Sequence, residues 1–540
     1  MLALADFADG LLRGTVLVAL AVLVGAVPWG LVVLRATRRA PDDPGARRAA
    51  GLVVGFAVVL AACQATLLGL KTVVLTSNVG PEAFGAFAHT LQFRGGAARL
   101  VLALAVIGIG LLLRAAPNDG RRWAALGLAD LALLGAGAAL VHAAGRLEHR
   151  GALMALTVLH QAAGIVWVGG LVQLVALGRL AQRDTRAAAL WPDAVGRFAR
   201  VAIAAVVLAT LASLPLVWIY VGALGGLVGS GYGSLVVAKL ALMGAALAFG
   251  ARNFFAGRRR DGADGRRTPA LVEAEALLLV TLVFTAAALA SQPPSVDTPE
   301  TQATPAELAE VFRPKWPTLT TPSIATKRAQ TADPLAVVGN ERTPTAYSWS
   351  NFSHNVAGVF LLVMSLLALL GTSRYARWAR HWPLGLVALA VFVFLRASAS
   401  DGTWPYGDVA PWSGDAEGLQ HRIAALLALL LGLLEWRARA ARDPGPLARL
   451  FPALAAFGGI LLLTHAHVAF EGKSSYLVQV THVVMGVLAV LLAAGRWLEL
   501  RLPGRAGRIA GAASGVAMLL VALVLLFYRE ANVVVGPLPS

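Results

Sequence analysis

Long apolar runs alternate with short polar connections along most of the chain. Each run has about the 20 residues that an α-helix needs to cross the hydrocarbon core of a bilayer. The pattern therefore predicts an all-α polytopic membrane protein with about 14 transmembrane helices. The expected helices cover residues 14–34, 51–72, 96–114, 122–144, 152–178, 199–222, 233–252, 270–291, 350–371, 382–397, 419–436, 449–466, 475–495 and 508–528.

Basic residues are distributed unevenly between the two sides of this arrangement. Arginines follow every odd-numbered run, as in Arg258, Arg259 and Arg260 after the seventh, and these connections hold most of the 46 basic residues. Cytoplasmic loops of membrane proteins carry such an excess of arginine and lysine. The pattern therefore predicts that the arginine-rich side is cytoplasmic and that both termini are extracytoplasmic.

One long stretch, residues 292–348, interrupts the apolar runs. It is rich in Pro, Thr and Ala and has no apolar period, apart from one short helix expected over 305–312. We interpret it as an extracytoplasmic linker. It divides the chain into an eight-helix domain, residues 1–291, and a six-helix C-terminal domain, residues 349–540.

Composition supports a lipid bilayer as the main partner. The chain is 58% hydrophobic and 14% charged, against about 25% charged in soluble proteins. The net charge of +17 is spread over separate loops, which argues against nucleic acid binding. A single cysteine, Cys63, excludes an internal disulfide and a CxxC site. The first run is too long for a cleaved signal peptide, so we expect a retained helix.

Histidines gather at the extracytoplasmic ends of the C-terminal helices. Imidazole is a common ligand for copper, zinc and haem iron, and polar groups grouped at a membrane boundary indicate function. The predicted orientation places five histidines at a similar depth, which predicts an outward-facing metal site. Met485, one turn after the last of them, is a candidate thioether ligand. The five are His354, His421, His465, His467 and His482.

The fifth run carries a further histidine inside the membrane. It reads HQAAGIVWVGG from His160 onward, and Gly164, Gly169 and Gly170 would allow another helix to come close. His160 serves either as a metal ligand or as a hydrogen-bonding group toward a neighbouring helix. His89, near the outer side, could complete an entry site.

Several of these stretches resemble the copper resistance protein D (CopD) family of bacterial inner-membrane proteins. HQAAGIVWVGGLVQLVAL resembles the family's His-x6-Trp-x-Gly-Gly signature, and YGSLVVAKLALMGAALAFGARNFF resembles its Tyr-Gly…Lys…Asn helix, with Lys239 and Asn253 at the matching places. WSNFSHNVAGVFLL and LLLTHAHVAFEGK resemble the C-terminal extension of some members. The resemblance implies copper handling in the bacterial inner membrane, usually described as movement of copper across it. A separate periplasmic copper-binding donor protein is a further expected partner, because no CopC-like β-domain is present.

Three functions remain open from the sequence. A copper transporter or copper resistance protein explains the one-sided imidazoles, although copper(I) favours Cys and Met ligands, and the chain has one Cys and six Met. A b-type haem protein would use two of the histidines as axial ligands. A membrane assembly factor would need neither transport nor an enzymatic activity. The chain has no Walker A sequence and no HExxH, so ATP-driven pumping and zinc-peptidase chemistry are not expected.

Overall fold

The computed structural model describes residues 2–138, 146, 148–258, 268–326, 329, 344–371, 376–397, 416–441, 445–464 and 473–530, and these contain helices and no strand. The chain forms two compact units. The N-terminal unit comprises Leu2–Ala223 and Lys239–Val296. The C-terminal unit comprises Leu224–Ala238 and Asp297–Ser540. Residues 224–238, which we predicted as part of the first domain, are thus grouped with the helices that follow the linker.

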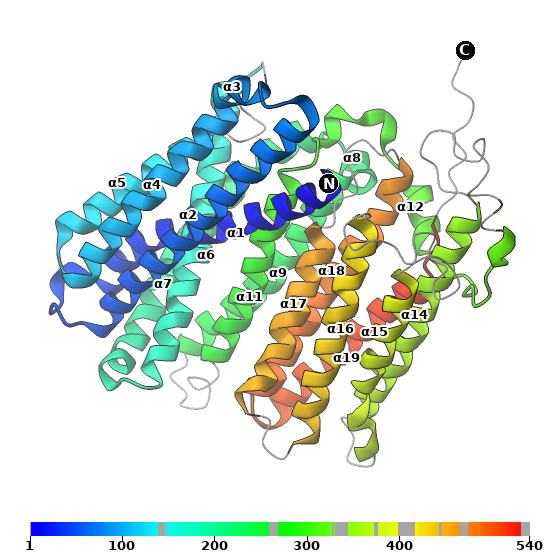
Figure 1. Cartoon of the computed structure of the whole chain (residues 1–540). Helices are drawn as coiled ribbons and strands as arrows, with labels where there is room; N and C mark the ends of the chain where they lie inside the picture. The colour runs from blue at the N-terminus through cyan, green and yellow to red at the C-terminus, as the bar shows by residue number, and fades with distance from the viewer. Residues whose placement is uncertain are drawn as a thin grey trace. The chain divides into compact units, whose positions relative to one another are not determined.

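Helix α1 is the central helix of the N-terminal unit (Figure 1). It packs against α2, α5, α6 and α11, while α4 lies against α2 and α5, and α7 lies against α6. The side chains of α1 from Ala19 to Leu23 are almost completely buried. The bounds are α1 Leu2–Pro28, the π-helical turn η1 Trp29–Leu34, α2 Pro44–Val79, α3 Ala83–Ala88, α4 Leu91–Ala115, α5 Gly120–Ala138, α6 Arg150–Ala181, α7 Thr185–Val221, α9 Gly231–Arg258 and α11 Thr268–Leu289.

Glycines set the close crossing of α1 and α6. A Cβ at Gly169 would overlap the backbone carbonyl of Ala21 in α1. A Cβ at Gly170 would overlap the ring of Phe198 in α7. Both glycines therefore do what the sequence predicted. Gly164 does not, because a Cβ there would meet nothing within 4 Å.

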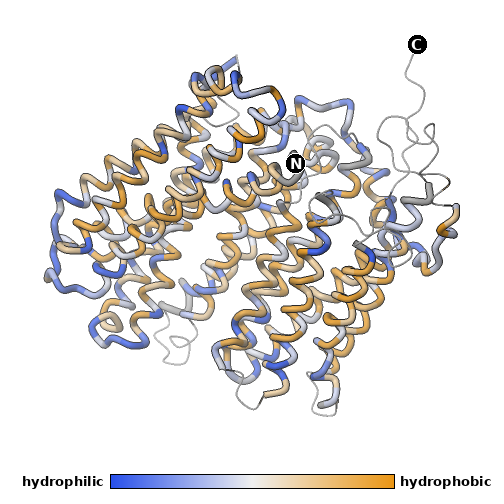
Figure 2. Tube along the Cα trace, in the orientation of Figure 1, coloured by the Kyte–Doolittle hydropathy of each residue, from blue (hydrophilic) through white to orange (hydrophobic). Residues whose placement is uncertain are grey.

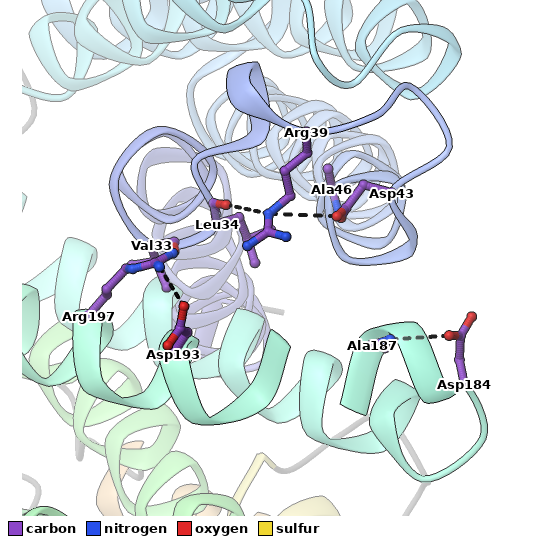
Figure 3. Close-up of polar contacts among 9 residues, drawn as sticks. All are labelled: Val33, Leu34, Arg39, Asp43, Ala46, Asp184, Ala187, Asp193 and Arg197. Carbon is purple, nitrogen blue, oxygen red and sulfur yellow. Dashed lines mark hydrogen bonds and ion pairs between the residues drawn. The ribbon is translucent and has the colours of Figure 1, made fainter. Parts of the chain in front are cut away.

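Polar side chains form hydrogen bonds with backbone groups at the helix ends on the arginine-rich side of this unit (Figure 3). Asp43 accepts a hydrogen bond from the first turn of α2, which it caps. The last carbonyls of η1 are bound by arginines: Arg39 Nε donates to Leu34 O at 2.8 Å, and Arg197 Nη1 donates to Val33 O at 3.0 Å. Helix ends leave such groups unpaired unless side chains or water bind them.

The helices after the linker form a ring in the C-terminal unit. From α14 to α19 each helix packs against the next, and α19 packs back against α14 (Figure 1). The bounds are α14 Pro344–Leu370, α15 Leu384–Ala397, α16 Ala416–Ala440, α17 Leu450–Thr464, α18 Lys473–Arg501 and α19 Gly504–Leu526.

The short helix predicted within the linker is confirmed as α12, Pro305–Phe312. A capping box starts it, in which Thr304 and Glu307 bind each other's backbone N–H groups. Val311 packs in a buried cluster with Tyr476 and Val480 of α18. The linker therefore packs on the helical ring through this helix, which also contacts α8, Leu224–Gly229.

Hydropathy follows the expected membrane pattern. Among the described residues, twelve helices are long and apolar enough to cross a membrane. They coincide with all the predicted runs except the fourth and eleventh, whose positions hold α5 and α16. Figure 2 shows apolar residues along the helices and hydrophilic ones concentrated at their ends. The protein is thus a multi-pass helical membrane protein, while the count of fourteen stays a prediction.

Candidate metal site

His354 lies in the first turns of α14, where α14 and α19 approach each other closely. A Cβ at Gly358, one turn further on, would overlap the backbone of Leu526, so only glycine allows this approach. The fully buried Asn355 donates from Nδ2 to Leu525 O and to Tyr528 O, each at 3.0 Å. These contacts hold the end of α19 beside the histidine.

Tyr528, directly after α19, covers one face of the His354 imidazole. The two rings are stacked, with centroids 4.1 Å apart and an angle of 29° between the planes. The Tyr528 hydroxyl donates to Glu530 at 3.2 Å, and the Ser350 hydroxyl donates to the same carboxylate oxygen. Glu530 is 9% exposed and therefore places a buried negative charge near the histidine.

His482 of α18 lies next to His354. Their ring centroids are 6.4 Å apart and the planes are nearly perpendicular, at 84°. Each ring forms the same bond to its own helix: Nδ1 lies 2.9 Å from Ser350 O in His354 and 3.0 Å from Val478 O in His482. A carbonyl can only accept, so Nδ1 carries a hydrogen in both rings, and Nε2 carries the lone pair whenever the ring is neutral.

The linker contacts the same end of α14 as this pair. The backbone N–H of Thr318 donates to Asn355 Oδ1 at 2.6 Å, and the Arg529 guanidinium donates to the carbonyl of Trp316 and to the same Asn355 oxygen. Residues 316–318 are thereby tied to α14 and to the segment after α19. The site is therefore assembled from four separate parts of the chain: the linker, α14, α18 and the segment after α19.

The other predicted ligands lie in different places in the structure or outside its described residues. Met485 is on α18, three residues from His482, and is 4% exposed. His421 is partly buried near the start of α16, and its membership of the site stays a prediction. His465 and His467 lie outside the described residues. His89 is exposed at the end of α3, where Arg94 donates to its Nδ1 at 3.0 Å.

Among the described residues, no group of three or more His, Cys, Asp or Glu side chains is arranged to hold a metal ion. What the described part of the chain brings together is one histidine pair, with a carboxylate that Ser350 and Tyr528 bind beside His354. The five-histidine site of the sequence analysis is neither completed nor excluded by this arrangement, because two of its members lie beyond the described residues.

The N-terminal unit contains a second group of polar side chains. His160 of α6 lies 2.9 Å through Nδ1 from the carbonyl of Ala209 in α7, so this imidazole does bind a neighbouring helix. The charge of Lys239 lies close enough to act on it. On α11, the buried Glu275 accepts hydrogen bonds from Asn253, at 3.5 Å, and from Trp167.

Sequence reasoning missed Tyr528 and Glu530. The stretch FYRE at the end of the last apolar run contained a signal, since an ionisable residue at the edge of a membrane segment indicates function. That they lie beside His354 could not be predicted from the sequence, because this depends on the contact between α14 and α19.

The helical architecture defines the general class of this chain, a multi-pass membrane protein. Residues 192–289 match the family model described as Copper resistance protein D, which supports the resemblance to that family in this segment. The match spans α7 to α11 and includes Lys239 and Asn253, whereas His160 and the helices after the linker lie outside it. No curated protein and no solved structure matches the chain.

Proposed function

We propose that this protein is a copper transport or copper resistance protein of the bacterial inner membrane, which binds copper on the extracytoplasmic side of its C-terminal unit and moves it across the membrane. The observation that carries the proposal is the His354–His482 pair. Two imidazoles with centroids 6.4 Å apart, each with Nε2 as its basic nitrogen, have the donor chemistry that copper needs.

The surroundings of the pair support a metal more than a structural role. A histidine that ligates a metal usually donates its other N–H to a carbonyl or carboxylate, which orients the ring. Both rings have this bond. Met485 offers a soft sulfur for copper(I), and Glu530 offers negative charge to balance the cation. His421, His465 and His467 are the proposed further ligands.

Metal content of the purified full chain tests the site. We expect about one copper per chain in the wild type and at least tenfold weaker copper binding in H354A and H482A. H381A is the matched control, because His381 lies at the opposite end of the helical ring and its Nδ1 accepts a hydrogen bond from Trp436 at 3.0 Å. Equal copper content and affinity in all four proteins would contradict the proposed site.

The same samples distinguish the alternative functions. A visible spectrum with a Soret band, together with bound iron, would support b-type haem and redox chemistry in place of copper transport. Uptake of labelled copper into vesicles separates transport from binding alone. Binding without uptake would favour a membrane assembly factor, and uptake stimulated by a periplasmic copper protein would identify the expected donor.

The proposed function includes an orientation of the chain in the membrane. Eight helices before the linker 292–348 and six after it, with both termini extracytoplasmic, would place the histidine pair on the outer side. Reporter fusions in the connections test it. A fusion within 259–267 should be active only with a cytoplasmic reporter, and one within 313–326 only with a periplasmic reporter.

A further inference from the structure

A basic cluster lies at the end of the N-terminal unit opposite its arginine-rich connections. It consists of Asp9 and Arg13 of α1, Lys71 of α2 and Arg99 of α4. Arg13 Nε lies 2.5 Å from Asp9 Oδ2, and Lys71 Nζ lies 3.6 Å from Asp9 Oδ1. A single carboxylate therefore serves two cations, which neutralises only one of them.

Arg99 adds a third positive charge, held deeper in the helices. Its guanidinium lies against the backbone of α5 at Gly137, where a Cβ would overlap Nη2. Its Nε is buried and has no hydrogen-bond partner among the described residues. The charge of Arg13 is close enough to act on it unfavourably. A buried guanidinium beside like charges is destabilising unless an anion compensates it.

No other carboxylate of the described helices supplies that compensation. Both oxygens of the buried Asp130 on α5 lack hydrogen-bond partners among the described residues, so it forms no such bond to Arg99. The sequence of residues 139–147 contains no acidic residue. Among the described side chains, three cations face the single carboxylate of Asp9. The cluster keeps an excess of positive charge.

We infer that the basic cluster binds one phosphate group, either that of an anionic lipid headgroup or that of free inorganic phosphate. Guanidinium groups bind phosphate oxygens through paired N–H donors, and an ammonium adds a point charge. The side chains of Arg13 and Lys71 are 35% and 24% exposed, so the cluster is open to a ligand from outside. Arg99 then supplies the buried donor at the bottom of the site.

The test uses the purified full chain, stripped of lipid in a zwitterionic detergent. One arm adds phosphatidylglycerol or phosphatidylcholine and counts retained lipids by native mass spectrometry. The other arm titrates inorganic phosphate and measures thermal stability. R99Q and K71Q are the test variants. R94Q is the matched control, because Arg94 lies on the same helix but is exposed and contacts His89.

We expect the wild type and R94Q to bind one anion, and R99Q and K71Q to bind it about tenfold more weakly. Selective retention of phosphatidylglycerol identifies a lipid headgroup, and stabilisation by phosphate alone identifies the free anion. If R99Q fails to fold, K71Q decides the question. The inference would be overturned if the wild type bound neither phosphatidylglycerol nor inorganic phosphate more strongly than K71Q and folded R99Q do.

Discussion

The imidazole of His354 stacks on the phenol ring of Tyr528, with 4.1 Å between ring centroids. The contact joins the start of α14 to the segment after α19, and it exists because Gly358 lets these helices approach. It also restricts the rotation of a proposed copper ligand. Several measurable consequences depend on contacts of this kind.

Replacement of Tyr528 should weaken copper binding without removing a ligand. An aromatic pair contributes about 0.5–1.5 kcal/mol beyond its buried area, so Y528L should raise the copper Kd by about 2- to 12-fold. Y528F keeps the stack and loses only the hydrogen bond to Glu530, so its Kd should stay nearer to the wild type. Competition titration with a copper chelator measures both. An identical Kd for Y528L and the wild type would contradict a role for the stack.

Gly169 and Gly164 offer a matched pair on α6. The Cβ in G169A would overlap the Ala21 carbonyl, and backbone cannot move aside cheaply, so we expect a loss of about 1–3 kcal/mol in unfolding free energy. G164A has open space and replaces a helix-interior glycine, so it should be neutral or stabilising by up to about 1 kcal/mol. Unfolding in SDS measures both. Equal stabilities would mean that α1 and α6 do not cross at Gly169.

Glu435 of α16 holds two arginines inside the C-terminal unit. It is fully buried, with Oε1 at 2.5 Å from Arg439 Nε and 2.9 Å from Arg496 Nε. E435Q would leave Glu499, which also pairs with both arginines, as their single carboxylate, and breaking a buried ion pair costs about 3–5 kcal/mol. Unfolding in SDS should show this loss. The control E310Q breaks an exposed pair with Lys315 and should leave unfolding unchanged.

The docking of α12 should depend on pH through Glu307. The Thr304 backbone N–H and the nearby Lys473 lower the pKa of this carboxyl below its usual 4.5. Because the pKa is lower in the docked state, the stabilisation is complete above about pH 4.5 and is lost as the pH falls through the docked-state pKa. A spin label at A309C, in a C63S background, should become mobile in that window.

The control for this titration is E307Q, which removes the ionisable group and the ion pair to Lys473, 3.1 Å away. Its spin label should be more mobile at neutral pH and should show no step on acidification. A step of the same size in E307Q would assign the pH dependence to another group.

Much of the helical framework could be predicted from the sequence. The apolar runs located the spans, and the TPAE start with the apolar residues after it located α12. The candidate site was predictable only in outline. His354 and His482 were expected at one depth, and the structure makes them neighbours. Tyr528 and Glu530 were missed because nothing local in FYREA indicates which helix lies beside it.

The sequence by itself determined where helices form and how long they are, because a bilayer acts on each apolar segment separately through its own length and hydropathy. The tertiary structure decided which side chains meet. The rotation of each helix against its neighbours decides these contacts. It decides that Gly169 and not Gly164 touches α1, and that His354 lies beside Tyr528 and His482. That rotation is set by packing between residues more than a hundred positions apart, which no local pattern records.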